Sequence, residues 1–186
     1  NTHERGFNFD QFLGKGDLEN AKKTVDAACR EAQKHGLTFL YAVALMYDLM
    51  FRKYVGEFSE TEEIARHLLA LAASLNNRFL YGQVHMWLGM ARYFKGDLDS
   101  ALPCVDEAEE ILSDEASRGE TQLHLIKLIR GLIHVRHGIQ DRTEPDLHAA
   151  MEYFHTISSK GLSMDANLVM ALLKWQQNDR DETARY

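Results

Sequence analysis

The chain has 186 residues, of which 45% are hydrophobic and 26% charged, and this composition excludes a disordered or collagen-like chain. The formal net charge is −7, and the 21 Lys and Arg residues are scattered among 28 acids, which argues against direct contact with nucleic acid. No apolar run reaches the roughly 18 residues that a membrane-spanning helix needs, so we expect no membrane contact. Cys29 and Cys104 belong to no motif, which favours a reducing, cytoplasmic setting.

Two features of the composition predict an all-α protein. The chain contains only two prolines, well below average usage. Long stretches also lack alternating β-branched residues and are rich in Ala, Leu, Met, Glu and Lys, which favour helices.

A short phrase occurs twice, as KGDLENA at residues 15–21 and KGDLDSA at residues 95–101. Its glycine sets a period, because Gly16, Gly56, Gly96 and Gly138 are 40, 40 and 42 residues apart. Glycine supplies the left-handed conformation that ends many helices, and Asp is a preferred first cap of the next one. We therefore expect a tight turn between two helices at each glycine. Base–glycine pairs at 35–36 and 160–161 predict two further helix ends.

An amphipathic helix, called helix B, is predicted after each turn glycine. The stripe of the first copy is Leu18, Ala21, Val25 and Ala28. In the second copy the segment SETE predicts a capping box with Ser59 as the cap. Its stripe would start one turn later, at Ile64, Ala65, Leu68, Leu69 and Ala72. The third stripe is Leu98, Ala101, Leu102, Val105, Ala108, Ile111 and Leu112, with a bend or late start predicted at Pro103. The fourth stripe is Leu147, Ala150, Phe154 and Ile157.

A different helix, called helix A, is predicted before the turn glycines, over residues 40–55, 80–95 and 122–137. These segments are apolar nearly all the way round, so each must be covered on more than one side. Gly89 and Gly131 each stand seven residues before their turn glycine. A small residue at that position predicts a close approach of the neighbouring helix.

Helix A, the glycine turn and helix B form a unit of about 40 residues that must stack on its neighbours to bury its apolar surface. Four units are predicted, with a fifth beginning at Leu162. In NDRDETA at 178–184, we expect Asp179 in place of the turn glycine and Ala184 in place of Ala21. Because the chain starts at Asn1 and ends at Tyr186 within a helical pattern, we expect one domain over residues 1–186, about four and a half repeats of a longer chain.

The pattern Leu88-Gly89, Gly96, Ala101 and Ala108 resembles the tetratricopeptide (TPR) repeat. The similarity covers the whole chain but is loose, because Arg92 and Ser113 replace a consensus Tyr and Pro, and the period exceeds the usual 34 residues or so. The resemblance implies a right-handed α-α superhelix of antiparallel helix pairs. Long, degenerate units of this kind are similar to the helical arrays of LuxR-type and maltose-activator-like bacterial transcriptional regulators.

Nine histidines could indicate a metal site or catalysis. His124, His134 and His137 share one predicted helix, but no further ligand motif accompanies them. His35 and His137 precede glycines at predicted helix ends, where a base complements the helix dipole. No phosphate loop or nucleophile motif is present. We expect no catalytic residue, metal or cofactor; the alternative is a metal-dependent enzyme that uses the His124/His134 region with Arg130.

In the TPR-like arrangement, one face of each helix A lines the concave surface. The predicted binding face is Met46, Met50, Lys53, Gln83, Met86, Trp87, Met90, Tyr93, Leu128 and Leu132, with Val43, Leu125 and Val135 beside them. Nearby polar residues that could orient an acidic ligand are Arg52, His85, Arg92, Lys127 and Arg130.

Three hypotheses remain open for this apolar face. It is closed core, or a groove for a peptide, protein or small effector, since Met adapts to varied apolar partners, or a surface buried in a homodimer. The expected function is a non-catalytic interaction or effector-sensing module of a bacterial transcriptional regulator. A self-assembly scaffold is the alternative.

Overall fold

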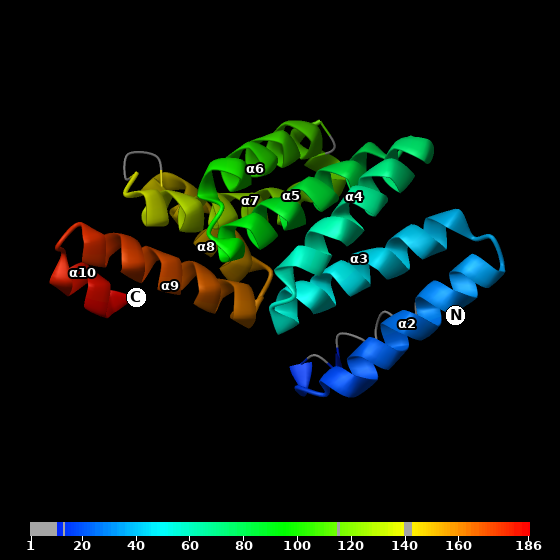
Figure 1. Cartoon of the computed structure of the whole chain (residues 1–186). Coiled ribbons are helices and arrows are strands. Elements are labelled where there is room, and N and C mark those ends of the chain that lie inside the picture. Colours follow the sequence, from blue (N-terminus) through cyan, green and yellow to red (C-terminus); the bar gives the residue numbers. More distant parts are fainter. Residues whose placement is uncertain (1–10, 13, 115, 140–142) are drawn as a thin grey trace.

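The computed structural model describes residues 11–12, 14–114, 116–139 and 143–186. In this part of the chain all regular structure is helical, which confirms the all-α prediction (Figure 1). The helices are α2 (Leu18–Lys34), α3 (Thr38–Val55), α4 (Phe58–Ser74), α5 (Arg78–Lys95), α6 (Leu98–Ser113), α7 (Ala116–His137), α8 (Thr143–Thr156), α9 (Lys160–Gln176) and α10 (Arg180–Arg185).

Each helix packs against the next one along the chain. The A helices α3, α5, α7 and α9 also contact one another in order: α3 touches α5, α5 touches α7, and α7 touches α9. Among the described residues, the B helices α2, α4, α6 and α8 do not pack against each other. The A helices therefore lie together on one side and the B helices cover them separately.

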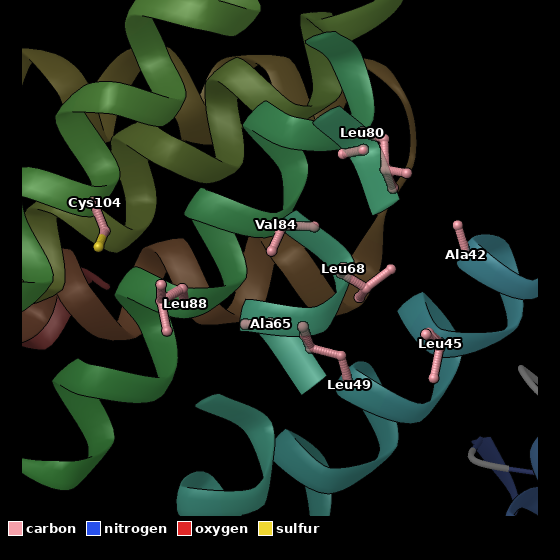
Figure 2. Packing of buried hydrophobic residues seen from close by; sticks show 10 residues of the cluster. Ala42, Leu45, Leu49, Ala65, Leu68, Leu80, Val84, Leu88 and Cys104 are labelled. Carbon is pink, nitrogen blue, oxygen red and sulfur yellow. The ribbon is translucent and has the colours of Figure 1, made fainter. Parts of the chain in front are cut away.

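The hydrophobic core is divided into separate clusters, each formed by helices that are consecutive in the chain. One buried cluster joins α3, α4 and α5, a second joins α5, α6 and α7, and a third joins α7, α8 and α9. Figure 2 shows the first cluster, in which side chains from α3, α4 and α5 converge and Cys104 of α6 lies at its edge. Each unit is thus stabilised by its neighbours in the sequence.

The predicted turns are confirmed. Gly16, Gly56, Gly96 and Gly138 all have positive φ, between 72° and 86°, as the left-handed turn requires. The fifth turn is one residue earlier than predicted, because Asn178 adopts this conformation with φ 62°. Asparagine tolerates the left-handed region better than other side chains do.

The N-caps explain the rest of the repeated phrase. Asp17 and Asp97 each accept a hydrogen bond from the backbone N–H three residues on, at 3.2 Å. Asp179 does the same for Glu182 at 3.0 Å, so it is the cap of α10 and not the substitute for the turn glycine. Of the two further helix ends, the one at 35–36 is confirmed, whereas residues 160–161 lie in the first turn of α9.

The second B helix departs from its prediction. α4 begins at Phe58 with Glu57 at the cap position, so Ser59 is not the N-cap and no capping box forms. Glu62 pairs instead with Arg92 and Lys95 of α5. The predicted late start at Pro103 is also wrong, because α6 runs continuously from Leu98 through the proline.

The buried stripe of α4 begins at the same distance from the turn glycine as in the other B helices, and not one turn later as predicted. Five residues after the turn glycine, Ala21 and Ala101 are fully buried, and Thr61 and Thr143 occupy the same position with no exposed surface. The hydroxyls of Thr61 and Thr143 donate to the carbonyls of residues 57 and 139 at 2.8 and 2.9 Å. Because this bond satisfies the hydroxyl, threonine can replace alanine at a buried site. At the other ends of the stripes, Leu18 and Ile157 are exposed.

The predicted close approach at two glycines is confirmed. A Cβ built on Gly89 would lie 2.6 Å from Cγ2 of Val105, and one on Gly131 would lie 2.7 Å from Cδ2 of Leu147. Both distances are shorter than van der Waals contact, so a larger residue would push the A and B helices apart.

Candidate functional site

A groove runs along the A-helix side of the molecule, with a volume of about 480 Å³. It lies between α3 and α5 and reaches the first turns of α7. The lining residues are Phe39, Val43, Met46, Tyr47, Met50, Asn77, Phe79, Leu80, Gln83, Met86, Trp87, Gln122 and Leu125.

The groove is mostly apolar. Methionines line it on both α3 and α5, and aromatic rings stand along it from Phe39 and Phe79 to Trp87. Its polar groups are three side-chain amides, the Tyr47 hydroxyl and the Trp87 indole N–H. The amide of Asn77 is held in place because its oxygen accepts the Leu80 N–H at 2.9 Å. Rigid rings beside flexible thioethers give a surface that can adapt to an apolar ligand.

Half of the predicted binding face lies in this groove. The predicted residues that line it are Val43, Met46, Met50, Gln83, Met86, Trp87 and Leu125. Met86 forms the floor, because it is only 1% exposed and also packs in the cluster between α5, α6 and α7. Met46, Met50 and Trp87 are partly exposed.

The other half of the predicted face lies outside the groove lining, and its apolar members pack on the core. Leu128 and Val135 of α7 are buried against α8 and α9, and Leu132 packs on the same cluster. Met90 and Tyr93 pack on the cluster between α5, α6 and α7. The groove is therefore open along α3 and α5 and closed along most of α7, where α9 covers the helix.

Some lining residues were missed by the sequence prediction. They are Phe39, Tyr47, Asn77, Phe79, Leu80 and Gln122. The repeat contained a signal for the aromatic ones, since Phe39 and Phe79 both stand seventeen residues before the turn glycine, and Tyr47 and Trp87 both stand nine before it. The lining face simply extends one helical turn further than predicted.

Lys53 stands on α3 about one turn after Met50, beside the groove but not among its lining residues. Its Nζ is 5.3 Å from the centroid of the Trp87 ring, a cation–π arrangement. Within the described residues it forms no ion pair. Burial lowers the pKa of Lys53, and the carboxylate of Asp165 on α9 opposes this shift.

Arg52 and Arg92, predicted as polar orienters of a ligand, are engaged in ion pairs. Arg52 contacts Asp48 at 3.3 Å and Glu57 at 2.8 Å. Arg92 contacts Glu62 of α4 and also donates to the Ser100 carbonyl of α6 at 3.2 Å. Their guanidinium groups therefore join structural elements outside the groove.

Arg130 has the same role between three helices. It bonds to Glu109 of α6 and, at 2.7 Å, to Asp146 of α8, beside a second cavity of about 600 Å³. Burial alone would lower the pKa of Arg130, but these hydrogen bonds outweigh it and hold the pKa above its ordinary value. Lys127 lies half-buried on α7, outside the groove lining.

His85 is buried between α5 and α6. Its Nδ1 is 3.3 Å from a carboxylate oxygen of Glu107, yet neither ring nitrogen has a hydrogen bond of good geometry. Burial lowers the pKa of His85, and Glu107 opposes the shift. This histidine faces helix α6 and not the groove.

The histidines proposed for an enzyme are in separate places. His124 stacks on Tyr153, with 4.2 Å between ring centroids, whereas Nδ1 of His134 is 3.3 Å from the hydroxyl of Thr143. In the described ranges, no group of three or more His, Cys, Asp or Glu residues is arranged to hold a metal ion.

No helix in the described part of the chain has both the length and the apolar character needed to cross a membrane. No known family model matches the chain, and no curated protein matches its sequence. The function of this chain must therefore be inferred from its geometry and its repeat pattern.

Proposed function

We propose that this chain is a non-catalytic binding module of the TPR-like kind, whose groove receives a peptide or a small effector. The observation that carries the proposal is the open groove along α3 and α5. Met46, Met50 and Trp87 line it while remaining partly exposed. A concave, mostly apolar surface with a few polar groups is typical of ligand-binding sites.

The packing order supports the superhelical arrangement. The A helices contact one another while the B helices do not, as expected if the A helices line the concave side of an α-α superhelix. Because each unit touches only its neighbours, a ligand that changes the angle between α3 and α5 would shift every unit beyond them. Ligand binding between α3 and α5 could therefore change the conformation of repeats that do not contact the ligand.

The proposed setting is a cytoplasmic bacterial transcriptional regulator. This part rests on the resemblance of the repeats to the arrays of LuxR-type and maltose-activator-like proteins. The full-length coding sequence tests it. A DNA-binding helix-turn-helix domain and a P-loop domain in the same protein would support the proposal, and a full-length sequence without either would contradict it.

The binding proposal is tested with N-phenyl-1-naphthylamine, a neutral apolar dye that fluoresces when it leaves water. We expect saturable one-to-one binding to the purified protein. Met46→Glu places a charge in the groove and should weaken binding at least tenfold. Leu168→Glu, at a residue of α9 that is 61% exposed, is the matched control and should leave binding unchanged. Absence of saturable binding, or equal effects of the two variants, would contradict the proposal.

A self-assembly scaffold is the second candidate, and α9 favours it. Met164, Leu168, Leu172 and Trp175 follow one another at helical spacing and are between 43% and 71% exposed. Such a stripe could bury itself against a second copy. Light scattering tests this: a dimer that Leu168→Glu dissociates would support it, and a strict monomer at high concentration would remove it.

A further inference from the structure

We infer that the ligand of the groove is a small apolar carboxylic acid, with its carboxylate at Lys53 and its apolar body along Met50, Met46 and Phe39. This inference rests on the proposed binding function and names the chemistry of the ligand. Three observations lead to it: an unpaired cation at one end, a groove of limited volume, and an apolar lining along the rest.

The first observation is the charge of Lys53. The neighbouring cation, Arg52, is engaged by Asp48 and Glu57. Lys53 makes no ion pair with any described residue, and its Nζ lies over the ring of Trp87, which lines the groove. Lys53 is thus the cation available to an anionic ligand at this end.

The electrostatics of Lys53 favour such a ligand. A half-buried ammonium loses hydration that only an opposite charge or hydrogen bonds can replace. Asp165 lies close enough to oppose the effect of burial but does not come within ion-pair distance. An incoming carboxylate would supply a charge-assisted hydrogen bond that the folded chain does not provide.

The second observation is size. From Phe39 to Met50 the groove follows α3 for eleven residues, or roughly 16 Å. The groove has a volume of about 480 Å³, which lies within the range typical of small-molecule sites. A ligand of small-molecule size therefore matches the groove.

The third observation is where the polar groups lie. The lining itself carries no charged side chain: its polar groups are the amides of Asn77, Gln83 and Gln122, the Tyr47 hydroxyl and the Trp87 indole N–H. A ligand with a second charge would have to bury it without a partner, which is costly. The lining therefore selects a single acid group at one end of an apolar body.

The test compares decanoate with 1-decanol, which has the same chain without the carboxylate. Each ligand displaces N-phenyl-1-naphthylamine from the purified protein, from Lys53→Met and from Lys34→Met. Lys34 is an exposed cation at the end of α2, so its variant is matched in charge. Thermal unfolding verifies that both variants are folded.

We expect decanoate to bind the parent protein and Lys34→Met about tenfold more tightly than decanol, and Lys53→Met to bind both equally. Equal binding of the two ligands by the parent protein would overturn the inference while leaving the groove function intact. An amphipathic Leu- and Glu-rich peptide that displaces the dye more tightly than decanoate would overturn it in favour of a peptide ligand. If the dye itself does not bind, the proposed function fails as well.

Discussion

The helix pairs α3–α4 and α5–α6 occupy the same positions in two successive repeats but fill their interfaces in opposite ways. Seven residues before the turn glycine, α3 has Leu49 and α5 has Gly89. Nine residues after it, α4 has Ala65 and α6 has Val105. Leu49 and Ala65 are both fully buried in the same cluster, which Figure 2 shows.

The same two positions face each other in both repeats, but the residue types at these positions differ. A large side chain on helix A faces a small one on helix B in the first pair, and the sizes are exchanged in the second. The pair α7–α8 follows the second arrangement, with Gly131 against Leu147. Because protein interiors are close-packed, the combined volume of the two facing side chains must stay nearly constant from one interface to the next.

Gly89→Leu should have the largest effect, because it gives α5 the residue of α3 without the matching change in α6. The first added carbon already lies 2.6 Å from Cγ2 of Val105 and 3.1 Å from the Ala101 carbonyl oxygen. We expect a loss of about 3 kcal/mol in the free energy of unfolding. Urea denaturation measures it.

The double variant Gly89→Leu/Val105→Ala gives the α5–α6 interface the same residue pair as Leu49 and Ala65 in the α3–α4 interface. We expect the double variant to recover at least half of the loss, so that the two changes are not additive. Gly161→Leu is the control, since a Cβ there meets nothing within 4 Å. Additive losses in the double variant would show that size matching does not govern this interface.

The arginines four residues before the turn glycine give the second contrast. Arg92 reaches Glu62 of α4 and the Ser100 carbonyl of α6, whereas Arg52 pairs with Asp48 of its own helix and Glu57 of the next turn. Arg92→Met should therefore cost about 1–2 kcal/mol, because it leaves partly buried partners unmet.

Arg52→Met should cost less, about 0.5 kcal/mol, as is usual for pairs within one helix and its turn. Thermal unfolding of the two variants at low salt compares them directly. Equal losses would mean that the contacts between helices add nothing beyond the local pair.

Eleven residues before the turn glycine, α3 has Leu45, which does not titrate, and α5 has His85, which does. The two repeats should therefore differ in how their stability depends on pH. Burial lowers the pKa of His85 in the folded chain below its ordinary value of 6.5, so the unfolded chain binds the proton more readily. Stability is therefore full above pH 6.5 and is lost as the pH falls through 6.5 toward the folded pKa.

Giving α5 the residue of α3, His85→Leu, should remove part of this loss of stability between pH 7 and pH 5. The pKa values of His124 and His134 are also lowered, chiefly by burial, so some acid sensitivity remains. Unfolding temperatures at the two pH values measure the change, with the exposed His155→Leu as control. An unchanged pH profile in His85→Leu would exclude this histidine as a source of the sensitivity.

Turn positions and close helix approaches could be predicted from the sequence because they depend on local geometry and single glycines. Thr61 was missed because a buried hydroxyl is acceptable only with its bond to the Glu57 carbonyl, which a polarity pattern does not reveal. The pattern also does not reveal which part of the predicted face stays open. Leu128 has the same position in its repeat as Met46, but the packing of α9 on α7 covers only Leu128.

The smallest effect on stability is expected at the groove itself. Six residues before the turn glycine, Met50 of α3 lines the groove, whereas Met90 of α5 packs on the cluster with α6 and α7. Met90→Ser should cost about 1 kcal/mol, because this partly buried side chain packs on a buried cluster. Met50→Ser should cost less than about 0.5 kcal/mol, because Met50 is also partly buried but belongs to none of the buried clusters of the described residues. In dye titrations the order should reverse, with Met50→Ser the weaker binder, because the α3 position faces the ligand and the α5 position faces the core.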